Sequence, residues 1–267
     1  MKNKVIVITG ASSGIGRALA KEFASKGARL SLGARRTELL EELKSELPET
    51  EILIQKTDVS IEDNCRQLIE ETIKRYGQID VLINNAGISM RAIFEEVDLK
   101  VIKQLMDINF YGTVYCTKFA LPYLLKTKGS LVGVISIAGY VGLPGRSGYS
   151  ASKFAIRGFL DTVRIENIKN GLHVLVAAPG FTASEVRKEA LTNHGQKQGE
   201  TPRDENNMMS SEECARHIVK AVIKRKRQLI LTFAEGKLTV FVGKFFPALL
   251  DKITYRHMAK EPNSPLK

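Results

Sequence analysis

The sequence predicts an α/β fold in which a parallel sheet lies between two layers of helices. Apolar runs of strand length recur along the chain, with helical segments between them, at residues 4–9, 28–34, 51–56, 79–84, 130–136, 172–178 and 228–233. Strands that alternate with helices indicate βαβ units. The runs are continuous rather than alternating with polar residues, which indicates strands buried on both faces. We therefore expect a doubly wound parallel sheet of about seven strands.

The composition is typical of one globular domain. The chain has 267 residues, of which 43% are hydrophobic and 26% charged, which excludes disordered and fibrous classes. No Pro/Gly-rich linker or internal repeat divides it, so residues 1–267 are predicted to form a single domain. The N-terminus runs directly into an apolar strand, and Cys65, Cys116 and Cys214 are far apart without metal-ligand spacing. We expect a cytoplasmic protein with reduced thiols and no metal.

Glycines and caps mark the ends of the expected elements. Gly27, Gly77 and Gly171 stand where helices should stop before the next strand. The S-x-x-D pattern from Ser60 to Asp63 has the form of a capping box at the start of a helix. Residues 181–210 break the rhythm with a long polar segment, which is either a lid over a ligand crevice or a surface loop.

The positive charge of the chain is concentrated near its end. The net charge is +11, and residues 215–267 hold twelve Lys and Arg but only three Asp and Glu. The run KRKR at 224–227 suits the C-terminal end of a helix, so we do not expect nucleic-acid binding. The apolar and basic extension at about 234–267, interrupted by Pro247, is too charged to span a bilayer. It packs on the subunit, on a second subunit, or on an anionic lipid surface.

A glycine-rich turn follows the first predicted strand. Gly10, Gly14 and Gly16 lie between that strand and an amphipathic helix, with Ser12, Ser13 and Ile15 among them. Glycines permit a tight turn and close backbone approach, and the helix start offers free N–H groups to a pyrophosphate. The position of the turn predicts a dinucleotide site.

The residues at the end of the second predicted strand indicate which dinucleotide binds, NAD or NADP. An NAD site commonly has Asp or Glu here to bind the ribose 2′-hydroxyl, whereas this chain has Arg35 and Arg36. Guanidinium groups form strong, often bidentate pairs with phosphate. We therefore predict NADP(H). Arg17, inside the first helix, either assists or simply faces solvent.

Further along the chain, the motifs resemble those of the short-chain dehydrogenase/reductase superfamily. TGASSGIG (9–16), NNAG (84–87), Asn109 with Gly112, Ser136, Tyr149 with Lys153 and PGF (179–181) occur in the order and spacing of that family. The resemblance is dense over residues 4 to about 182. It implies a Rossmann-like sheet of order 3-2-1-4-5-6-7 and a catalytic set of Asn109, Ser136, Tyr149 and Lys153.

The pairing of Tyr149 with Lys153 has a chemical rationale. A free tyrosine has a pKa of about 10, which makes it a poor base at neutral pH. Residues four apart in a helix share one face, so the Lys153 ammonium can lie near the phenol and lower its pKa. The phenol would then exchange a proton with the substrate oxygen.

The resemblance also implies roles for other residues. Ser136 would hydrogen-bond the substrate oxygen, Lys153 would hold the nicotinamide ribose, and Asn109 would organise a water linked to Lys153. The expected cofactor contacts are Gly10, Ser12, Ser13, Gly14, Ile15, Gly16, Arg35, Arg36, Asp58, Val59, Asn85, Ala86, Gly87, Tyr149, Lys153, Pro179, Gly180 and Thr182. The expected substrate contacts are Ser136, Val141, Leu143 and Tyr149.

The sequence therefore predicts an oxidoreductase that transfers hydride between NADP(H) and a carbonyl or secondary alcohol. Apolar Val141 and Leu143 favour reduction of a hydrophobic ketone or aldehyde, hydroxysteroid-like or lipid-like. A 3-oxoacyl thioester reductase and a non-catalytic NADP-binding regulator or scaffold are the alternatives. A homodimer or homotetramer is expected, and peripheral membrane contact through the C-terminal extension is a further hypothesis.

Overall fold

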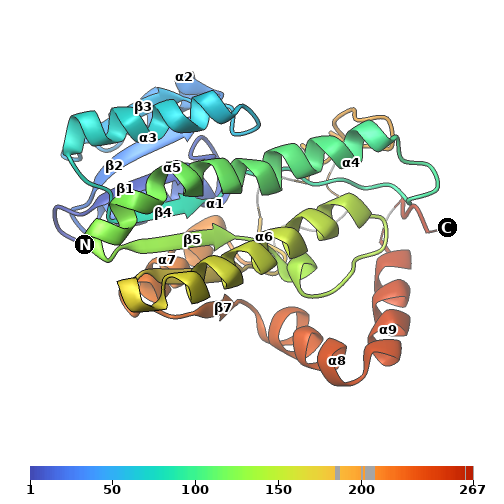
Figure 1. Ribbon diagram of the computed structural model, residues 1–267. Helices are drawn as coiled ribbons and strands as arrows, with labels where there is room; N and C mark the ends of the chain where they lie inside the picture. Colours follow the sequence, from blue (N-terminus) through green and yellow to red (C-terminus); the bar gives the residue numbers. More distant parts are fainter. Residues whose placement is uncertain (184–186, 200, 202–207, 262, 267) are drawn as a thin grey trace.

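A computed structural model of the chain describes residues 1–183, 187–199, 201, 208–261 and 263–266. Its central sheet has seven parallel strands in the order β3-β2-β1-β4-β5-β6-β7 (Figure 1), as predicted. The strands are β1 (Val5–Thr9), β2 (Arg29–Ala34), β3 (Ile52–Lys56), β4 (Val81–Asn84), β5 (Ser130–Val134), β6 (His173–Ala178) and β7 (Gln228–Ile230).

Helices cover both faces of this sheet. They are α1 (Gly14–Ala24), α2 (Thr37–Ser45), α3 (Glu62–Tyr76), α4 (Leu99–Leu105), α5 (Gly112–Thr127), α6 (Ser147–Glu166), α7 (Ser211–Ile223), α8 (Thr239–Phe245) and α9 (Pro247–Ala259). Short π-helical or 3₁₀ segments lie at Met106–Tyr111, Ile137–Gly139, Ile168–Asn170 and Phe233–Leu238. Thus α4, the π-helical turn and α5 form one continuous helical rod across the molecule (Figure 1).

The apolar core consists of two layers because successive side chains of a strand point to opposite faces. Ile6 and Ile8 of β1 pack with α1, α2 and α7 on one face. Val7, between them, packs with α3, α5 and α6 on the other. Continuous apolar strands are therefore required, which is why the pattern in the sequence identified them.

Element ends were predicted with mixed success. Gly77 closes α3 with φ of +74°, a left-handed conformation that glycine adopts without a steric penalty. The capping box from Ser60 to Asp63 is wrong. The helix α3 begins at Glu62 with Ile61 at its N-cap, and the Ser60 hydroxyl donates to the Asp58 carboxylate at 2.7 Å.

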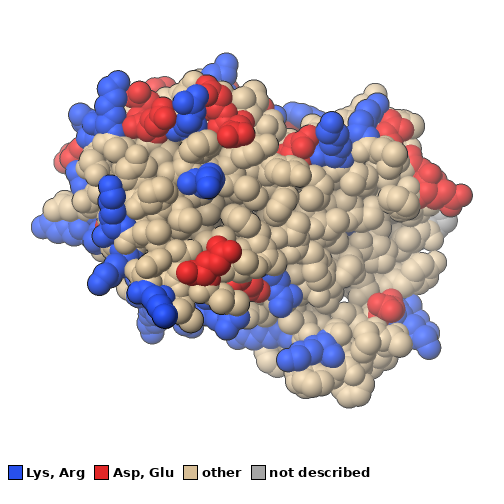
Figure 2. Space-filling view, in the orientation of Figure 1, with Lys and Arg blue, Asp and Glu red and all other residues tan. Residues whose placement is uncertain are grey.

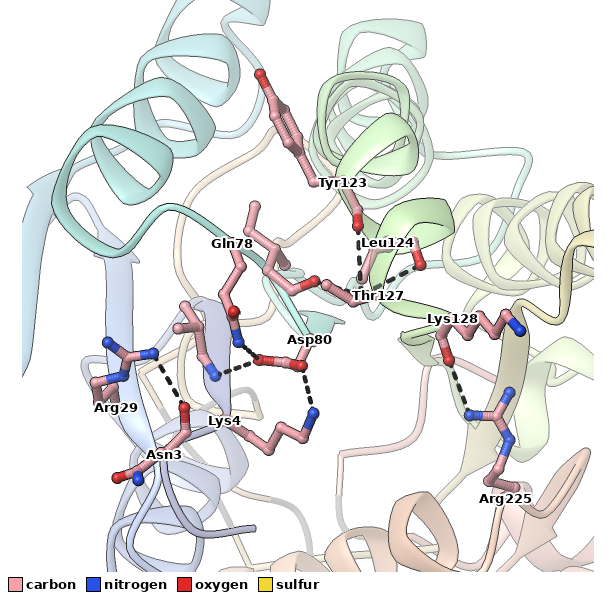
Figure 3. A network of polar contacts seen from close by, with 12 residues as sticks. Asn3, Lys4, Arg29, Gln78, Asp80, Tyr123, Leu124, Thr127, Lys128 and Arg225 are labelled. Carbon is pink, nitrogen blue, oxygen red and sulfur yellow. Dashed lines mark hydrogen bonds and ion pairs between the residues drawn. The ribbon is translucent and has the colours of Figure 1, made fainter.

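The edge of the sheet where strands begin is fastened by polar contacts (Figure 3). Asp80, which precedes β4, accepts hydrogen bonds from Lys4 Nζ and Val5 N at 2.8 Å and from Gln78 Nε2 at 2.7 Å. The buried carboxylate therefore has both oxygens paired, as a buried charge requires. This network joins the starts of β1 and β4, and leaves the opposite edge for the candidate site.

Candidate active site

The predicted catalytic residues gather where the central strands end. Ser136 follows β5, Tyr149 and Lys153 lie in the first turns of α6, and Asn109 lies in the π-helical segment before α5. A cavity of about 200 Å³ is lined by Ser136, Tyr149 and Lys153. Ligand crevices of parallel sheets form at this edge, outside the carboxyl ends of the strands.

Lys153 is buried against the end of β5. It is 4% exposed, and its Nζ donates a hydrogen bond to the Val134 carbonyl oxygen at 3.1 Å. Burial lowers the pKa of Lys153 to about 8, because a buried ammonium loses its hydration. The same Nζ lies 5.7 Å from the centroid of the Tyr149 ring, so the two side chains share one face of α6, as their spacing predicts.

Tyr149 differs from the sequence-based expectation in its proton affinity. Burial raises the pKa of its phenol, and a hydrogen bond with Ser136 and the charge of Arg146 only partly oppose the rise. The pKa of Tyr149 is thus raised rather than lowered, because desolvation disfavours phenolate. Tyr149 therefore carries its proton at neutral pH.

Ser136 and Asn109 are both fixed by hydrogen bonds. Ser136 Oγ accepts from Ala138 N at 3.2 Å and caps the 3₁₀ turn Ile137–Gly139. Asn109 Oδ1 accepts from Ile88 N at 2.8 Å, and its Nδ2 donates to Ile88 O at 3.0 Å and Ser152 Oγ at 2.9 Å. The amide of Asn109 therefore holds the chain after β4 against α6.

The hydrogen bonds of Asn109 are linked to Tyr149 through Ser152, which the sequence analysis missed. Ser152 is fully buried, and its hydroxyl donates to the Tyr149 carbonyl oxygen at 2.8 Å. Asn109 therefore positions the turn of α6 that bears Tyr149. The water-organising role predicted for Asn109 remains a prediction.

The glycine-rich turn packs tightly against the loop after β4. Gly10 has φ of +66°, and a Cβ there would lie 2.8 Å from the Ala86 Cα. Asn85 Nδ2 donates to Thr9 O at 3.0 Å and Gly10 O at 3.2 Å. The two loops thus form one wall of the cavity, with the start of α1 facing it. This cradle fits a dinucleotide, because backbone N–H groups and a helix N-terminus are available for a pyrophosphate.

The cavity wall includes many of the predicted cofactor residues. Its lining contains Gly10, Ser13, Gly14, Ile15, Asn85, Ala86, Gly87, Tyr149, Lys153, Pro179, Gly180 and Thr182. Gly87 is required for space, because a Cβ there would lie 3.0 Å from Asn109 Oδ1 and 3.3 Å from Lys153 Nζ. The structure therefore brings the nucleotide and catalytic motifs to one cavity.

Of the two arginines after β2, Arg36 contacts this cradle. Both side chains are exposed, and Arg36 Nη2 donates to Ser13 Oγ at 3.0 Å and Ser12 Oγ at 3.4 Å. Arg17 turns elsewhere, with Nη1 donating to Leu39 O at 3.1 Å and Nη2 paired with Glu46 at 2.5 Å. The structure thus gives Arg17 an ion pair with Glu46 that neither prediction named.

Asp58 and Val59 lie farther along the same edge. Asp58 Oδ1 accepts from Ser60 N at 3.0 Å and Ser60 Oγ at 2.7 Å. Val59 packs against the backbone of Gly112, where an added Cβ would lie 2.8 Å from the valine side chain. These contacts account for the turn after β3. The contacts of Asp58 and Val59 with adenine stay predictions.

Comparison with known proteins identifies the family. The short chain dehydrogenase family model matches residues 4–195. The chain belongs to the short-chain dehydrogenase family.

Relatives match nearly the whole chain. It is 33% identical to a "Dehydrogenase/reductase SDR family protein 7-like" of Dictyostelium discoideum, covering 96% of this chain and 82% of that protein. It is 36% identical to "11-beta-hydroxysteroid dehydrogenase A" of Sesamum indicum, covering 99% and 78%.

Solved structures agree. A short-chain dehydrogenase from Streptomyces avermitilis superposes with a TM-score of 0.81 at 26% identity, covering 97% of this chain and 98% of that one. An alcohol dehydrogenase from Thermococcus sibiricus, complexed with 5-hydroxy-NADP, superposes with a TM-score of 0.75 at 27% identity, covering 85% and 94%. This short-chain dehydrogenase is therefore an oxidoreductase of alcohol and carbonyl groups with a nicotinamide cofactor.

A second, apolar cavity of about 240 Å³ adjoins the first in this dehydrogenase. Ser136, Leu143, Gly180 and Phe181 line both cavities. The rest of the second lining comes from Ile137 and, on the C-terminal segment, Ala234, Thr239, Leu250, Ile253, Thr254, His257 and Met258. Helix α9 therefore forms a wall of the space beside Ser136.

The substrate residues predicted from sequence are only partly placed here. Leu143 lines both cavities. Val141 is 7% exposed and packs in the core with Leu250, so within the described part of the chain it lines neither cavity. The contribution of α9 was missed, because sequence spacing does not show which distant helix folds back over a strand end.

The segment 181–210 lies partly outside the described residues. Its described parts pack on the loop after β4, where Leu191 N donates to Ser89 O at 2.9 Å and Arg91 N donates to Leu191 O at 2.8 Å. Arg187 is 8% exposed and lines the first cavity. These contacts place the described parts of the segment beside the site. Within the described residues, no cluster of metal-ligating side chains occurs.

Proposed function

We propose that this protein is an NADPH-dependent reductase of hydrophobic ketones or aldehydes. The observation that carries the proposal is the position of Ser136, which lines both the nucleotide-side cavity and the apolar cavity. A carbonyl carbon between these spaces would face the cofactor on one side, while an apolar body would fill the other.

The residues present suit this reaction. When bound, NADPH supplies a hydride to the carbonyl carbon. Tyr149 donates its phenolic proton to the carbonyl oxygen, and Ser136 donates a hydrogen bond to the same oxygen, stabilising its developing charge. Lys153 holds positive charge beside the phenolate that forms, and the proton is replaced from solvent. The phenol of Tyr149 is protonated at neutral pH, because its pKa lies above the ordinary tyrosine value, so it carries the proton that reduction needs.

The preference for NADPH rests on Arg35 and Arg36, which follow β2, and on the hydrogen bonds that Arg36 donates to Ser12 and Ser13. A 2′-phosphate bound here would accept charge-assisted hydrogen bonds. The 5-hydroxy-NADP complex of the structurally similar alcohol dehydrogenase supports the same choice.

The substrate class rests on the apolar lining contributed by Leu250, Ile253 and Met258. The name of the sesame relative, 11-beta-hydroxysteroid dehydrogenase A, supports a hydroxysteroid-like or lipid-like substrate. A 3-oxoacyl thioester remains the alternative substrate, since its acyl chain would also enter an apolar cavity.

The test follows NADPH absorbance with ketones and aldehydes of increasing apolar size, steroids, quinones and 3-oxoacyl thioesters. We expect kcat/KM to rise with apolar size, and to be higher with NADPH than with NADH. Cofactor binding without turnover of any class would favour the regulator or scaffold alternative instead.

Short-chain dehydrogenases typically form oligomers, and we propose a homodimer or homotetramer for this chain. The outer face of the π-helical turn, α5 and α6 supports this, because Tyr111 and Phe154 are 43% and 42% exposed there, and Tyr111 stacks on Tyr115 with ring centroids 6.0 Å apart. A broad face with few charged side chains is visible in Figure 2. Light scattering of the purified protein measures the assembly.

A further inference from the structure

The C-terminal segment 233–260 carries an unusual density of exposed apolar side chains. It projects away from the sheet as α8 and α9 (Figure 1), and its surface is largely uncharged in Figure 2. The exposed residues that line neither cavity are Phe233, Leu238, Phe241, Phe245, Phe246, Leu249 and Tyr255, between 46% and 75% exposed. Exposed apolar side chains concentrated on one segment in this way are typical of a docking surface.

Cations border this apolar surface. Lys237, Lys244, Lys252 and Arg256 lie on the same segment and are exposed, and within the described residues none of them forms an ion pair. Lys252 and Arg256 are one turn apart on α9 and line a groove against Gly142 and Pro144, together with Asp251 and Tyr255. The apolar face is therefore edged by positive charge available to a partner.

Helix α9 has a second, inward face. Leu250 and Met258 are 8% and 5% exposed and line the apolar cavity beside Ser136. The outward Phe245 and Phe246, at the junction of α8 and α9, are 55% and 57% exposed. Packing of the helix on its own subunit thus uses the inward face and leaves the aromatic face uncovered.

We propose that this aromatic and basic face of α8 and α9 docks on the surface of an anionic lipid bilayer. Aromatic rings enter the boundary between headgroups and acyl chains, while lysine and arginine stems extend their charges to lipid phosphates. Seven-residue α8 and thirteen-residue α9 lie far below the roughly 20 residues of a spanning helix. Within the described residues, no helix is long and apolar enough to cross a membrane.

Charge argues against a second copy of the chain as the occupant. A two-fold symmetric contact places the same patch on both partners, so the lysines of both copies would be brought into one interface. An anionic lipid surface instead neutralises them. Docking places α9 between the bilayer and the apolar cavity. That the cavity receives a substrate rests on the proposed function, whereas the docking of α8 and α9 on lipid does not.

The test is cosedimentation of the full chain with phosphatidylcholine vesicles, with and without phosphatidylserine. We expect binding to the mixed vesicles, weakened by salt. Phe245→Ser with Phe246→Ser, and separately Lys244→Glu with Lys252→Glu, should each weaken it by about ten-fold or more. The matched controls are Ile165→Ser with Ile168→Ser, 67% and 72% exposed elsewhere, and Lys44→Glu with Lys169→Glu. These should bind as the unaltered chain does.

Each other outcome overturns the proposal. An unaltered chain that stays in the supernatant with both vesicle types would refute lipid docking. Equal losses in the control variants would remove the assignment to α8 and α9. If sedimentation velocity shows that the Phe245 and Phe246 variant loses self-association and no chain binds vesicles, the face joins two copies instead. NADPH turnover of a water-soluble ketone, measured in parallel, reports on the proposed function independently.

Discussion

The Lys153 ammonium donates a hydrogen bond to the Val134 carbonyl oxygen at 3.1 Å within the same cavity as Tyr149. This contact secures the lysine side chain at the end of β5, yet burial still lowers its pKa to about 8. The site therefore contains a cation that is costly to keep charged, next to a phenol that is costly to ionise.

Stability without cofactor should consequently depend on pH through Lys153. Between about pH 8 and pH 10.5, the folded state holds Lys153 neutral while the unfolded state still binds the proton. The free energy of unfolding should rise across this window, by about 3 kcal/mol from this group. Urea unfolding of the unaltered chain and of Lys153→Met on either side of pH 8 measures it. A difference between the two chains that stays constant with pH would contradict the assignment.

Tyr149→Phe should abolish reduction while leaving NADPH binding intact, because only the transferable proton is removed. We expect kcat to fall by about 10²-fold to 10⁴-fold. Ser136→Ala should lower kcat less, through loss of one hydrogen bond to the oxygen. NADPH fluorescence titration serves as the control for binding. Wild-type turnover by the phenylalanine variant would exclude Tyr149 as the proton donor.

Arg35→Ala and Arg36→Ala should each weaken NADPH more than NADH, since only NADPH carries a 2′-phosphate. A loss of about ten-fold in NADPH affinity corresponds to one charge-assisted hydrogen bond. Arg17→Ala is the matched control, because its guanidinium is engaged with Leu39 and Glu46. Equal losses of both cofactors in the Arg35 and Arg36 variants would refute the NADP(H) assignment.

Asn109→Ala should destabilise the site through unpaired backbone. It leaves Ile88 N without the acceptor that lies 2.8 Å away, at a cost of about 1–3 kcal/mol in the free energy of unfolding. Asn109→Asp keeps that acceptor and should recover part of the loss. Calorimetry of the two variants and the unaltered chain measures the change in stability. Identical melting temperatures for all three would show that the hydrogen bonds of Asn109 do not stabilise the fold.

The sequence predicted those features of the fold and the site that depend only on a short segment of the chain. Ile6, Val7 and Ile8 need burial on both sides, which predicts a parallel sheet, and the spacing of Tyr149 and Lys153 fixes them on one helix face. The family resemblance then supplied the strand order and the catalytic set. The NADP(H) choice, the homo-oligomer and the cytoplasmic location stay predictions.

Features that depend on tertiary packing could not be predicted from the sequence. The desolvation that raises the pKa of Tyr149 depends on everything packed around the phenol, not on the residue four positions away. In the sequence Ser152 is an ordinary helix residue, and its role becomes visible only through the hydrogen bond that Asn109 donates to it. The wall formed by Leu250 and Met258 depends on how α9 turns back after Pro247, which no local pattern specifies.

Glu261 and Pro265, near the end of the chain, lie against the rim of the substrate space. Glu261 and Arg91 form an ion pair at 3.6 Å with both side chains at most 7% exposed, and a Cβ added to Gly145 would lie 3.1 Å from Pro265 Cγ. Purification tags and fluorescent fusions attached at this terminus would therefore press on the loop just ahead of Tyr149. The N-terminus, at the opposite edge of the sheet, is the better place for them when kinetics are to be measured.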